Sequence, residues 1–237
     1  MASPSPKHAS TVLLLRPAPD GSFEVLLTRR PSEMKFLGGY YVFPGGSICP
    51  EDRSKKVLRR CRGLSGKEAQ KLLGDHLGPE LSLAHWVAVI RELFEEVGIL
   101  LCVTEDGAAP DMNNGAGARE LEDSRRALVG GSLDFGSFLE SENLVCDLNR
   151  LAYFSHRVTP EFFPIRFDTR FYLASLPDGQ IALSQSEEVD HSLWIAPAEA
   201  LREANRNLPL LPPTTTMLQN LCTYDSWQSV REKFGLE

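Results

Sequence analysis

The stretch LAHWVAVIRELFEEV, residues 83–97, constrains the fold of this chain more than any other segment. At about 100° per residue, its apolar side chains gather on one face of a helix. That face contains Leu83, Val87, Ile90, Phe94 and Val97, with Trp86 and Leu93 beside them. Gly98 follows, and glycine is the residue that most often ends a helix. The stretch therefore predicts an amphipathic helix whose apolar face packs on the remainder of the chain.

The opposite face of this helix has three carboxylates, because Glu92, Glu95 and Glu96 stand at i, i+3 and i+4. Carboxylates this close repel one another and destabilise an isolated helix. A divalent cation removes the repulsion, and magnesium prefers oxygen ligands shared between carboxylates, water and substrate phosphates. The alternative is a solvated acidic surface, on which Arg91 simply pairs with Glu95 four residues later.

The remaining pattern is that of a mixed α/β domain, in which strands and helices alternate. Strands are expected at 10–16, 23–30, 99–103, 150–160, 166–176 and 191–197, and 40–46 is expected to be a short strand that ends in a glycine loop. Helices are expected at 65–73, 119–129, 134–142 and from 197 onward. The expected organisation is a disordered lead at 1–9, a domain at 10–212, and a C-terminal helical extension at 213–237 that packs on the domain.

Composition excludes several classes of protein. The net charge of −7 argues against a nucleic-acid or acidic-membrane partner. No apolar stretch is long enough for a transmembrane helix, and the first ten residues lack the apolar core of a signal peptide. The five scattered cysteines favour reduced thiols over a disulfide framework or a zinc site. The C-terminal KFGLE is not a peroxisomal tripeptide signal, so a cytoplasmic location is expected.

A glycine turn at Pro44-Gly45-Gly46 is weak evidence alone, but it gains meaning beside RELFEEVGI at 91–99. Together the segments resemble the Nudix hydrolase signature, in which a glycine, five residues and an acid precede R-E-apolar-x-E-E-x-G-apolar. Counting from Gly46 reaches Asp52, where the family usually has glutamate. The two halves, 45–52 and 91–99, are separated by a spacer much longer than the family's, with an insertion at about 53–83. A surface loop can lengthen in this way at small entropic cost.

A second resemblance concerns the segment LLTRRPSEMKFLGGYYVFPGG, residues 26–46. It is similar to the extra motif of the Nudix coenzyme A diphosphatases and departs from it at Pro31 and Lys35. Lysine keeps the charge of the motif's arginine but loses its planar fork. The insertion and RFDTRFYLA, residues 166–174, resemble most the peroxisomal acyl-coenzyme A diphosphatase subgroup. The resemblance extends over roughly residues 10–213.

The resemblance implies a Nudix-type α/β/α sandwich with a mixed sheet, of the α/β (α+β) class. It also implies Mg2+- or Mn2+-dependent hydrolysis of coenzyme A or acyl-coenzyme A to 3′,5′-ADP and (acyl-)4′-phosphopantetheine. The expected metal ligands are Glu92, Glu95 and Glu96, with Glu188 as a weaker ligand and Asp52 as either a weaker outer ligand or an orienting group. Arg91 would orient a glutamate, Gly45 and Gly46 would shape the loop beside the metal, and Arg30 and Lys35 would bind coenzyme A phosphates.

Other readings stay open at this stage. One is a Nudix hydrolase of another diphosphate, such as NADH or ADP-ribose, and another is a catalytically silent Nudix scaffold. Glu187 and Glu188 precede the last strand, where the family often has a further acidic metal ligand or base, and they are equally compatible with ordinary loop acids. His156 is either a base or an ordinary strand histidine. The sequence does not determine the acyl-chain preference, the glutamate that acts as base, or the roles of the insertion and closing helices. A homodimer is compatible with the sequence, which does not fix the oligomeric state.

Overall fold

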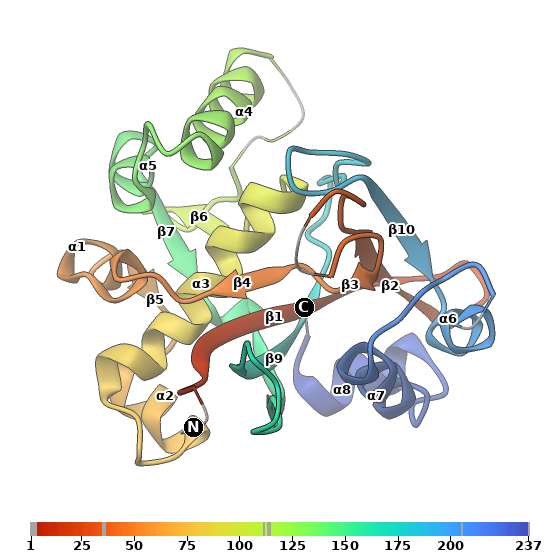
Figure 1. Cartoon of the computed structure of the whole chain (residues 1–237). Coiled ribbons are helices and arrows are strands. Elements are labelled where there is room, and N and C mark those ends of the chain that lie inside the picture. Colours follow the sequence, from red (N-terminus) through yellow and green to blue (C-terminus); the bar gives the residue numbers. More distant parts are fainter. Residues whose placement is uncertain (1–3, 35–36, 111, 113–114, 205, 237) are drawn as a thin grey trace.

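The computed structural model describes residues 4–34, 37–110, 112, 115–204 and 206–236, and a mixed sheet runs through its centre (Figure 1). The strands follow the order β10-β2-β1-β9-β8, while β3 pairs with β2 and β4 pairs with β1. Only the β1–β9 pair is parallel among these pairings. The strands are β1 (Lys7–Pro17), β2 (Phe23–Arg29), β3 (Tyr41–Val42), β4 (Gly45–Ser47), β8 (Ala152–Val158), β9 (Phe167–Ser175) and β10 (His191–Ile195).

The central strand β1 is apolar on both faces because both faces are covered. Val12 and Leu14 point into one core, and Leu13 and Leu15 point into a second core on the other side. A strand buried on both sides has a continuous apolar run rather than an alternating one, as VLLL shows. The first core packs beneath α3 (Pro79–Val97), and the second packs beneath α6 (Pro197–Glu203), α7 (Pro212–Leu221) and α8 (Trp227–Phe234).

These C-terminal helices lie at the lower right of Figure 1, across the sheet from α3. Their buried residues Met217, Leu218, Leu221 and Val230 join the same core as Leu13 and Val25 of the sheet. Apolar burial of this kind contributes about 25 cal/mol per Å2. The closing helices are therefore part of the second core of the domain.

The long spacer folds into secondary structure of its own. It contains η1 (Glu51–Arg53), α1 (Lys55–Leu58), β5 (Cys61–Arg62) and α2 (Gly66–Leu73), before α3 begins at Pro79. A capping box starts α2, since the Ser65 hydroxyl accepts from Glu68 N and the Glu68 carboxylate accepts from Ser65 N. Val57, Ala69 and Leu73 are buried in the core beneath α3. The helix expected at 65–73 is confirmed.

A second, three-stranded sheet in the order β5-β7-β6 lies beside α3. It contains β6 (Cys102–Thr104) and β7 (Leu144–Asp147), and two helices flank it, α4 (Gly115–Val129) and α5 (Phe135–Ser141). The strand expected at 99–103 is wrong in its first half. Residues 99–101 are buried but lie outside β6: the side chain of Gln180 bonds both the N–H and the carbonyl of Leu100, and the Leu101 carbonyl accepts from the N–H of Asp147.

The lead expected to be disordered at 1–9 is corrected at residues 7–9, and residues 1–3 lie outside the described part of the chain. Strand β1 begins at Lys7, where the backbone N–H donates to the carbonyl of Arg166, and residues 7–9 pair with residues 167–169 of β9. The sequence of this segment is polar, but the parallel partner satisfies its backbone groups. No helix in the described ranges combines the length and apolarity needed to cross a membrane.

Candidate active site

A buried ion pair joins the two separated segments. The Arg91 guanidinium donates from Nε to Oδ1 of Asp52 at 2.8 Å and from Nη2 to Oδ2 at 3.1 Å. Asp52 is fully buried, and Arg91 is nearly so. Asp52 Oδ2 also accepts from the backbone N–H of Cys49 at 2.8 Å, so both carboxylate oxygens are engaged. A paired carboxylate of this kind orients its partner. The geometry thus favours the orienting role for Asp52 over the role of a weaker metal ligand.

Arg91 also contacts two of the carboxylates on its own helix. Its Nη1 lies 2.9 Å from Oε1 of Glu92 and 3.0 Å from Oε2 of Glu95, and its Nη2 donates to the Ser47 carbonyl. Burial acts to lower the pKa of Arg91, but its hydrogen bond to Asp52 and the nearby glutamate charges raise the pKa overall. The arginine therefore stays charged and connects η1, β4 and α3.

The glycines expected to form a loop are in β4, which pairs with β1 in the register Ser10↔Gly46. Gly45 has φ +150°, and a Cβ there would lie 2.3 Å from the carbonyl oxygen of Ser10. A Cβ on Gly46 would lie 2.3 Å from Oε1 of Glu92. The N–H of Gly45 donates to Oε2 of Glu96 at 3.2 Å. Glycine is therefore required twice, for the backbone approach to β1 and for the approach of a carboxylate.

The three glutamates have raised pKa values, and burial is the main cause for each. The pKa of Glu92 rises to about 7, with Arg91 opposing the shift and Glu95 adding to it. Burial also raises the pKa of Glu95, against the opposing charge of Arg91. The pKa of Glu96 is raised well above its usual value by burial and by the charges of Glu92 and Glu188. Crowded, buried carboxylates strongly favour a bound cation.

The donor set fits a hard divalent cation, because every side chain in the acidic group offers oxygen. In this conformation, however, no three metal-ligating side chains among the described residues are arranged around a common point. The carboxylates of Glu92 and Glu95 are instead bound to Arg91.

A cleft of about 470 Å3 opens over this group. Arg30, from the end of β2, and Glu188, from the segment before β10, line it together with the three glutamates. The structure thus distinguishes Glu188 from Glu187, which lies 3.5 Å from Arg125 instead. Lys35 falls outside the described residues. The cleft floor also contains Ala9, Thr11, Phe167 and Thr169, which the sequence does not single out.

Arg125 is a further residue of this region that the sequence pattern does not indicate. It is buried, and its Nη1 donates to the backbone carbonyl of Glu95 at 2.8 Å, while Glu122 accepts from Nε and Nη2. A cation near the last turn of a helix satisfies carbonyls that have no partner within the helix. Arg125 therefore fixes the end of α3 from which the glutamates project.

His156 does not lie in this cleft. Its Nε2 lies 2.5 Å from Oδ1 of Asp168, which also contacts Arg170. Asp168 and Arg170 point to the opposite face of β9 from Phe167 and Thr169, which line the cleft. Arg166 donates from Nε to the carbonyl of Thr159 and from Nη1 to the carbonyl of Pro4.

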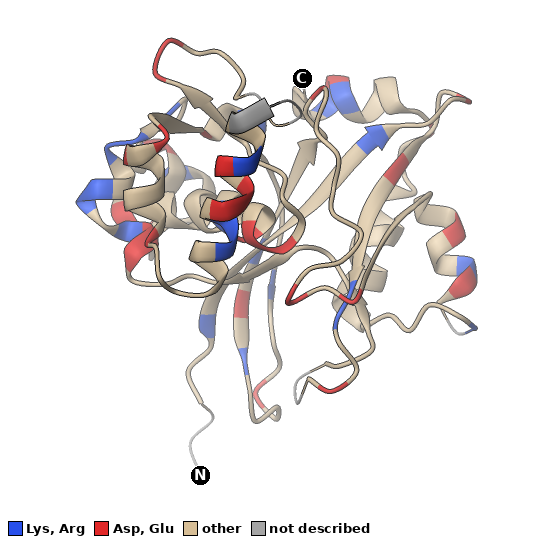
Figure 2. Cartoon of the chain, turned by 90° about the horizontal axis from the view of Figure 1, so that it is seen from above, with Lys and Arg blue, Asp and Glu red and all other residues tan. Residues whose placement is uncertain are grey.

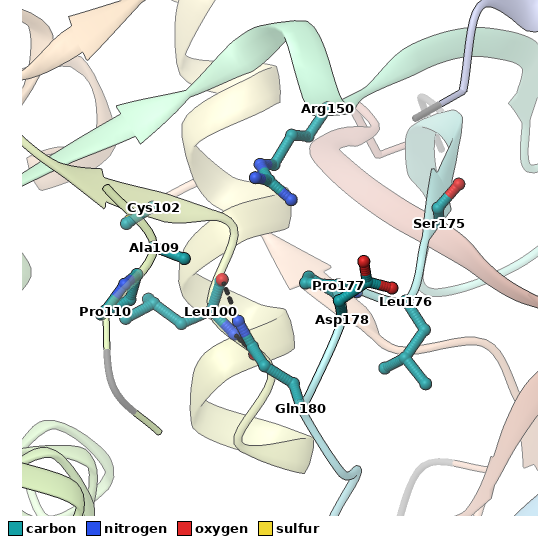
Figure 3. Close-up of a pocket in the computed structure, with 10 residues that line it drawn as sticks. All are labelled: Leu100, Cys102, Ala109, Pro110, Arg150, Ser175, Leu176, Pro177, Asp178 and Gln180. Carbon is teal, nitrogen blue, oxygen red and sulfur yellow. Dashed lines mark hydrogen bonds between the residues drawn. The ribbon is translucent and has the colours of Figure 1, made fainter. Parts of the chain in front are cut away.

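A second pocket, of about 310 Å3, lies beside the start of β6 and the end of β9 (Figure 3). Among the described residues, Arg150 and Asp178 are its charged lining residues, and the Gln180 side chain closes it against Leu100. The described lining contains no group of carboxylates and no glycine strand. The cleft over α3, whose last turns contain Arg91 and the three glutamates, is therefore the candidate active site. The charged positions of the chain are coloured in Figure 2.

Comparison with known proteins agrees with this assignment. The model of the NUDT19 Nudix domain matches residues 6–221. The chain is 31% identical to the acyl-coenzyme A diphosphatase NUDT19 of Gallus gallus, over 93% of this chain and 69% of that protein. The protein of the same name in Xenopus laevis is 26% identical, over 85% of this chain and 60% of that protein, less than two thirds of its length.

A solved structure supports the fold independently. The NUDIX hydrolase from Alicyclobacillus acidocaldarius has a TM-score of 0.75 and 26% sequence identity, and the match covers 97% of this chain and 96% of that one. The family match covers both halves of the acidic site and the insertion between them. The chain therefore belongs to the Nudix hydrolase family, in the branch described by the NUDT19 Nudix domain, and it is a Nudix diphosphatase of the α+β class.

Proposed function

We propose that this Nudix hydrolase cleaves the diphosphate of coenzyme A or acyl-coenzyme A, to give 3′,5′-ADP and (acyl-)4′-phosphopantetheine. The observation that carries the proposal is the placement of Arg30 in the same cleft as the buried glutamates of α3. A guanidinium suits the 3′-phosphate that distinguishes coenzyme A from most nucleoside diphosphates. Support also comes from the relatives, which are themselves named acyl-coenzyme A diphosphatases.

Glu92, Glu95 and Glu96 are the proposed ligands of Mg2+ or Mn2+, and Glu188 is a further candidate on the facing segment. A bound divalent ion neutralises diphosphate charge and lowers the pKa of a coordinated water. Arg91 holds the glutamate side chains in place, and Asp52 holds Arg91. Gly46 leaves room for the Glu92 carboxylate, and the Gly45 N–H bonds Glu96.

The test is a substrate panel with Mg2+ or Mn2+, with products identified by mass spectrometry. Coenzyme A and acyl-coenzyme A are expected to be cleaved faster than NADH and ADP-ribose, with 3′,5′-ADP as the shared product. Cleavage of NADH with no reaction of coenzyme A would overturn the substrate assignment. The folded Glu95→Gln, Glu96→Gln double variant is expected to lose activity by at least about a hundredfold, and full activity would overturn the metal-ligand assignment.

The role of Arg30 is tested by a ratio of substrates. Dephospho-coenzyme A lacks the 3′-phosphate, so only coenzyme A can form the phosphate contact with the Arg30 guanidinium. The Arg30→Gln variant is expected to reduce the preference for coenzyme A over dephospho-coenzyme A by about tenfold, because a charge-assisted hydrogen bond contributes about 1.5–3 kcal/mol. Arg29→Gln, one residue earlier in β2, serves as the control. An unchanged preference in Arg30→Gln would remove Arg30 from phosphate recognition.

A further inference from the structure

Exposed apolar side chains are concentrated in the turn between β8 and β9, residues 158–166. Seven large hydrophobic side chains in the described part of the chain are exposed, and four of them belong to this turn. Phe162 is 82% exposed, and the other three are Val158, Phe163 and Ile165. The rings of Phe162 and Phe163 lie 4.7 Å apart in a tilted pair. Such a patch on a monomer indicates a binding surface.

The turn is held in this conformation by its own hydrogen bonds. The N–H of Thr159 donates to the Phe167 carbonyl, and the Phe167 N–H donates to Oγ1 of Thr159. Arg166 Nε donates to the carbonyl of Thr159, and Phe163 N donates to the carbonyl of Pro160. The aromatic side chains are therefore presented to solvent by a closed turn, so little ordering entropy is lost when a ligand binds.

The turn continues the candidate active site along the sheet. Phe167 and Thr169, at the start of β9, line the cleft together with Ala9. Arg30 follows β2, and β2 and β9 flank β1 on opposite sides. A substrate whose 3′-phosphate lies at Arg30 and whose diphosphate lies beside the glutamates therefore extends toward Phe167. On the other face of β9, the charged Asp168 and Arg170 offer no comparable apolar route.

The distances agree with the length of the pantetheine arm. Gly46 pairs with Ser10, and Phe167 pairs with Lys7, so the two positions lie two strand spacings and three residues apart. This corresponds to about 10 Å across the sheet and about 10 Å along it, or about 14 Å in all. The arm from phosphorus to sulfur has about 13 bonds and extends to about 15 Å. The thioester would thus lie near Phe167, at the entrance to the turn.

We infer that the β8–β9 turn, with Phe162, Phe163 and Ile165, binds the acyl chain of an acyl-coenzyme A and sets a preference for acylated over free coenzyme A. The inference rests on the proposed function, and it adds a specificity surface outside the catalytic residues. A linear alkyl chain suits an open, tilted aromatic pair, because burial against such rings is apolar and requires no fixed orientation.

The test compares kcat/KM for a long-chain acyl-coenzyme A and for free coenzyme A, below the micellar concentration of the acyl substrate. In the Phe162→Ser, Phe163→Ser double variant, the ratio of the two constants is expected to fall by about tenfold, as loss of a few methylene contacts does. The control is Ile181→Ser, since Ile181 is 81% exposed but lies elsewhere on the surface. The control should keep the ratio of the unaltered protein.

The outcomes separate the two proposals. If the unaltered protein cleaves both substrates and the double variant keeps the ratio, the acyl-chain inference is wrong and the proposed function stands. If the unaltered protein cleaves neither substrate, the proposed function fails and the inference fails with it. The same variants are then examined by co-sedimentation with phosphatidylcholine vesicles and by size-exclusion chromatography. Loss of vesicle binding or of self-association with an unchanged ratio would assign the turn to a lipid surface or to a second copy of the chain instead.

Discussion

Arg91 is the residue on which the acidic site depends most, because it contacts Asp52, Glu92, Glu95 and the Ser47 carbonyl at once. The guanidinium presents five donors in a planar fork, and lysine could not reproduce these contacts. Its partner Asp52 stands where the family usually has glutamate, yet its shorter side chain makes a bidentate pair. The Asp therefore replaces the Glu without loss of the connection between the two halves of the site.

Asp52→Asn is expected to lower the free energy of unfolding by about 2–3 kcal/mol, because a buried arginine loses its fully buried counter-charge while two glutamates remain beside it. Urea denaturation measures the change. Mn2+ affinity, measured by isothermal titration, should change less than about threefold in Asp52→Asn and more than tenfold in Glu96→Gln if Asp52 only orients Arg91. A larger loss of Mn2+ affinity in Asp52→Asn than in Glu96→Gln would make Asp52 a ligand.

Alanine substitutions at the adjacent glycines Gly45 and Gly46 are expected to have different effects, one on stability and the other on activity. In Gly46→Ala, the methyl group meets the carboxylate of Glu92, a side chain that can turn away, so activity is expected to fall about a hundredfold while the fold is kept. In Gly45→Ala, the methyl group meets the Ser10 carbonyl at a φ of +150°, so the free energy of unfolding should fall by about 2 kcal/mol or more. Steady-state kinetics and chemical denaturation on both variants separate the effects. Equal stability losses would contradict the distinction.

At the scale of elements, the insertion is a structural component of the domain. Helix α2 packs on α3, and β5 pairs in parallel with β7. The insertion therefore packs on α3, while Arg91 and Glu96 at the other end of the helix contact η1 and β4. A spacer of this length does not separate the halves of the site, because the entropy cost of loop closure grows only slowly with length. Burial of the apolar residues of α2 offsets the conformational entropy lost when the insertion is ordered.

Leu73→Ala tests whether α2 is part of the core. Leu73 is buried beneath α3, so the truncation should lower the free energy of unfolding by about 2–4 kcal/mol, the cost of an unfilled cavity. Its neighbour Leu72 is 52% exposed, and Leu72→Ala should change stability by less than about 0.5 kcal/mol. Thermal or urea denaturation of the matched pair gives the answer. Similar values for both variants would mean that the insertion is not packed as described.

At the scale of the whole molecule, four of the chain's five histidines gather at one end of the sheet, around Arg170 and Asp168. The Nδ1 of His85 lies 2.8 Å from the Ser10 hydroxyl, and its ring packs edge-on against His8 at 5.5 Å between centroids. Burial, followed by the charge of Arg170, lowers the pKa of His85 to about 3. His8 and His156 have lowered pKa values for the same reasons.

These shifts predict a loss of stability in acid. An unfolded histidine takes up its proton near pH 6.5, whereas the folded His85 does so only near pH 3. Between these values the unfolded state binds more protons, so the free energy of unfolding falls as pH falls, by up to about 1.4 kcal/mol per pH unit. Above pH 6.5 the residue is neutral in both states and contributes no slope. The raised pKa of Glu92 acts in the opposite direction, since its protonation favours the folded state.

The contribution of His85 to the pH dependence of stability is obtained by comparing the unaltered protein with a His85 variant. Urea denaturation of the unaltered protein and of His85→Asn, with a chelator present, is compared at pH 7.5, 6.0 and 5.0. The stability of His85→Asn should depend less steeply on pH between about 6.5 and 5, because asparagine does not titrate and can still bond Ser10. Parallel pH profiles for the two proteins would exclude His85 as the source of the acid sensitivity.

Local pattern predicted the elements of this protein well where one face of an element is apolar. The helix that includes residues 83–97, the β1 and β2 strands and α2 all follow from periodicity and capping residues, which depend on near neighbours. The pattern failed at residues 7–9 and 99–101. There, residues 7–9 form a strand because β9 lies alongside, and the apolar residues 99–101 stay outside β6, with the Gln180 side chain bonded to Leu100 and the Asp147 N–H to Leu101. In both cases the deciding hydrogen bonds come from residues distant in the sequence.

By itself, the sequence determined that three glutamates share one helical face and that an acid follows Gly46 at a defined spacing. Both features follow from the number of residues between the positions concerned. Only the tertiary structure decided how they are used. It paired Arg91 with Asp52 across the insertion, brought Glu188 rather than Glu187 into the cleft, and placed Arg125 on the end of α3. The physical reason is that charges and hydrogen bonds act over a few ångströms in space, and sequence separation does not reveal which residues come that close.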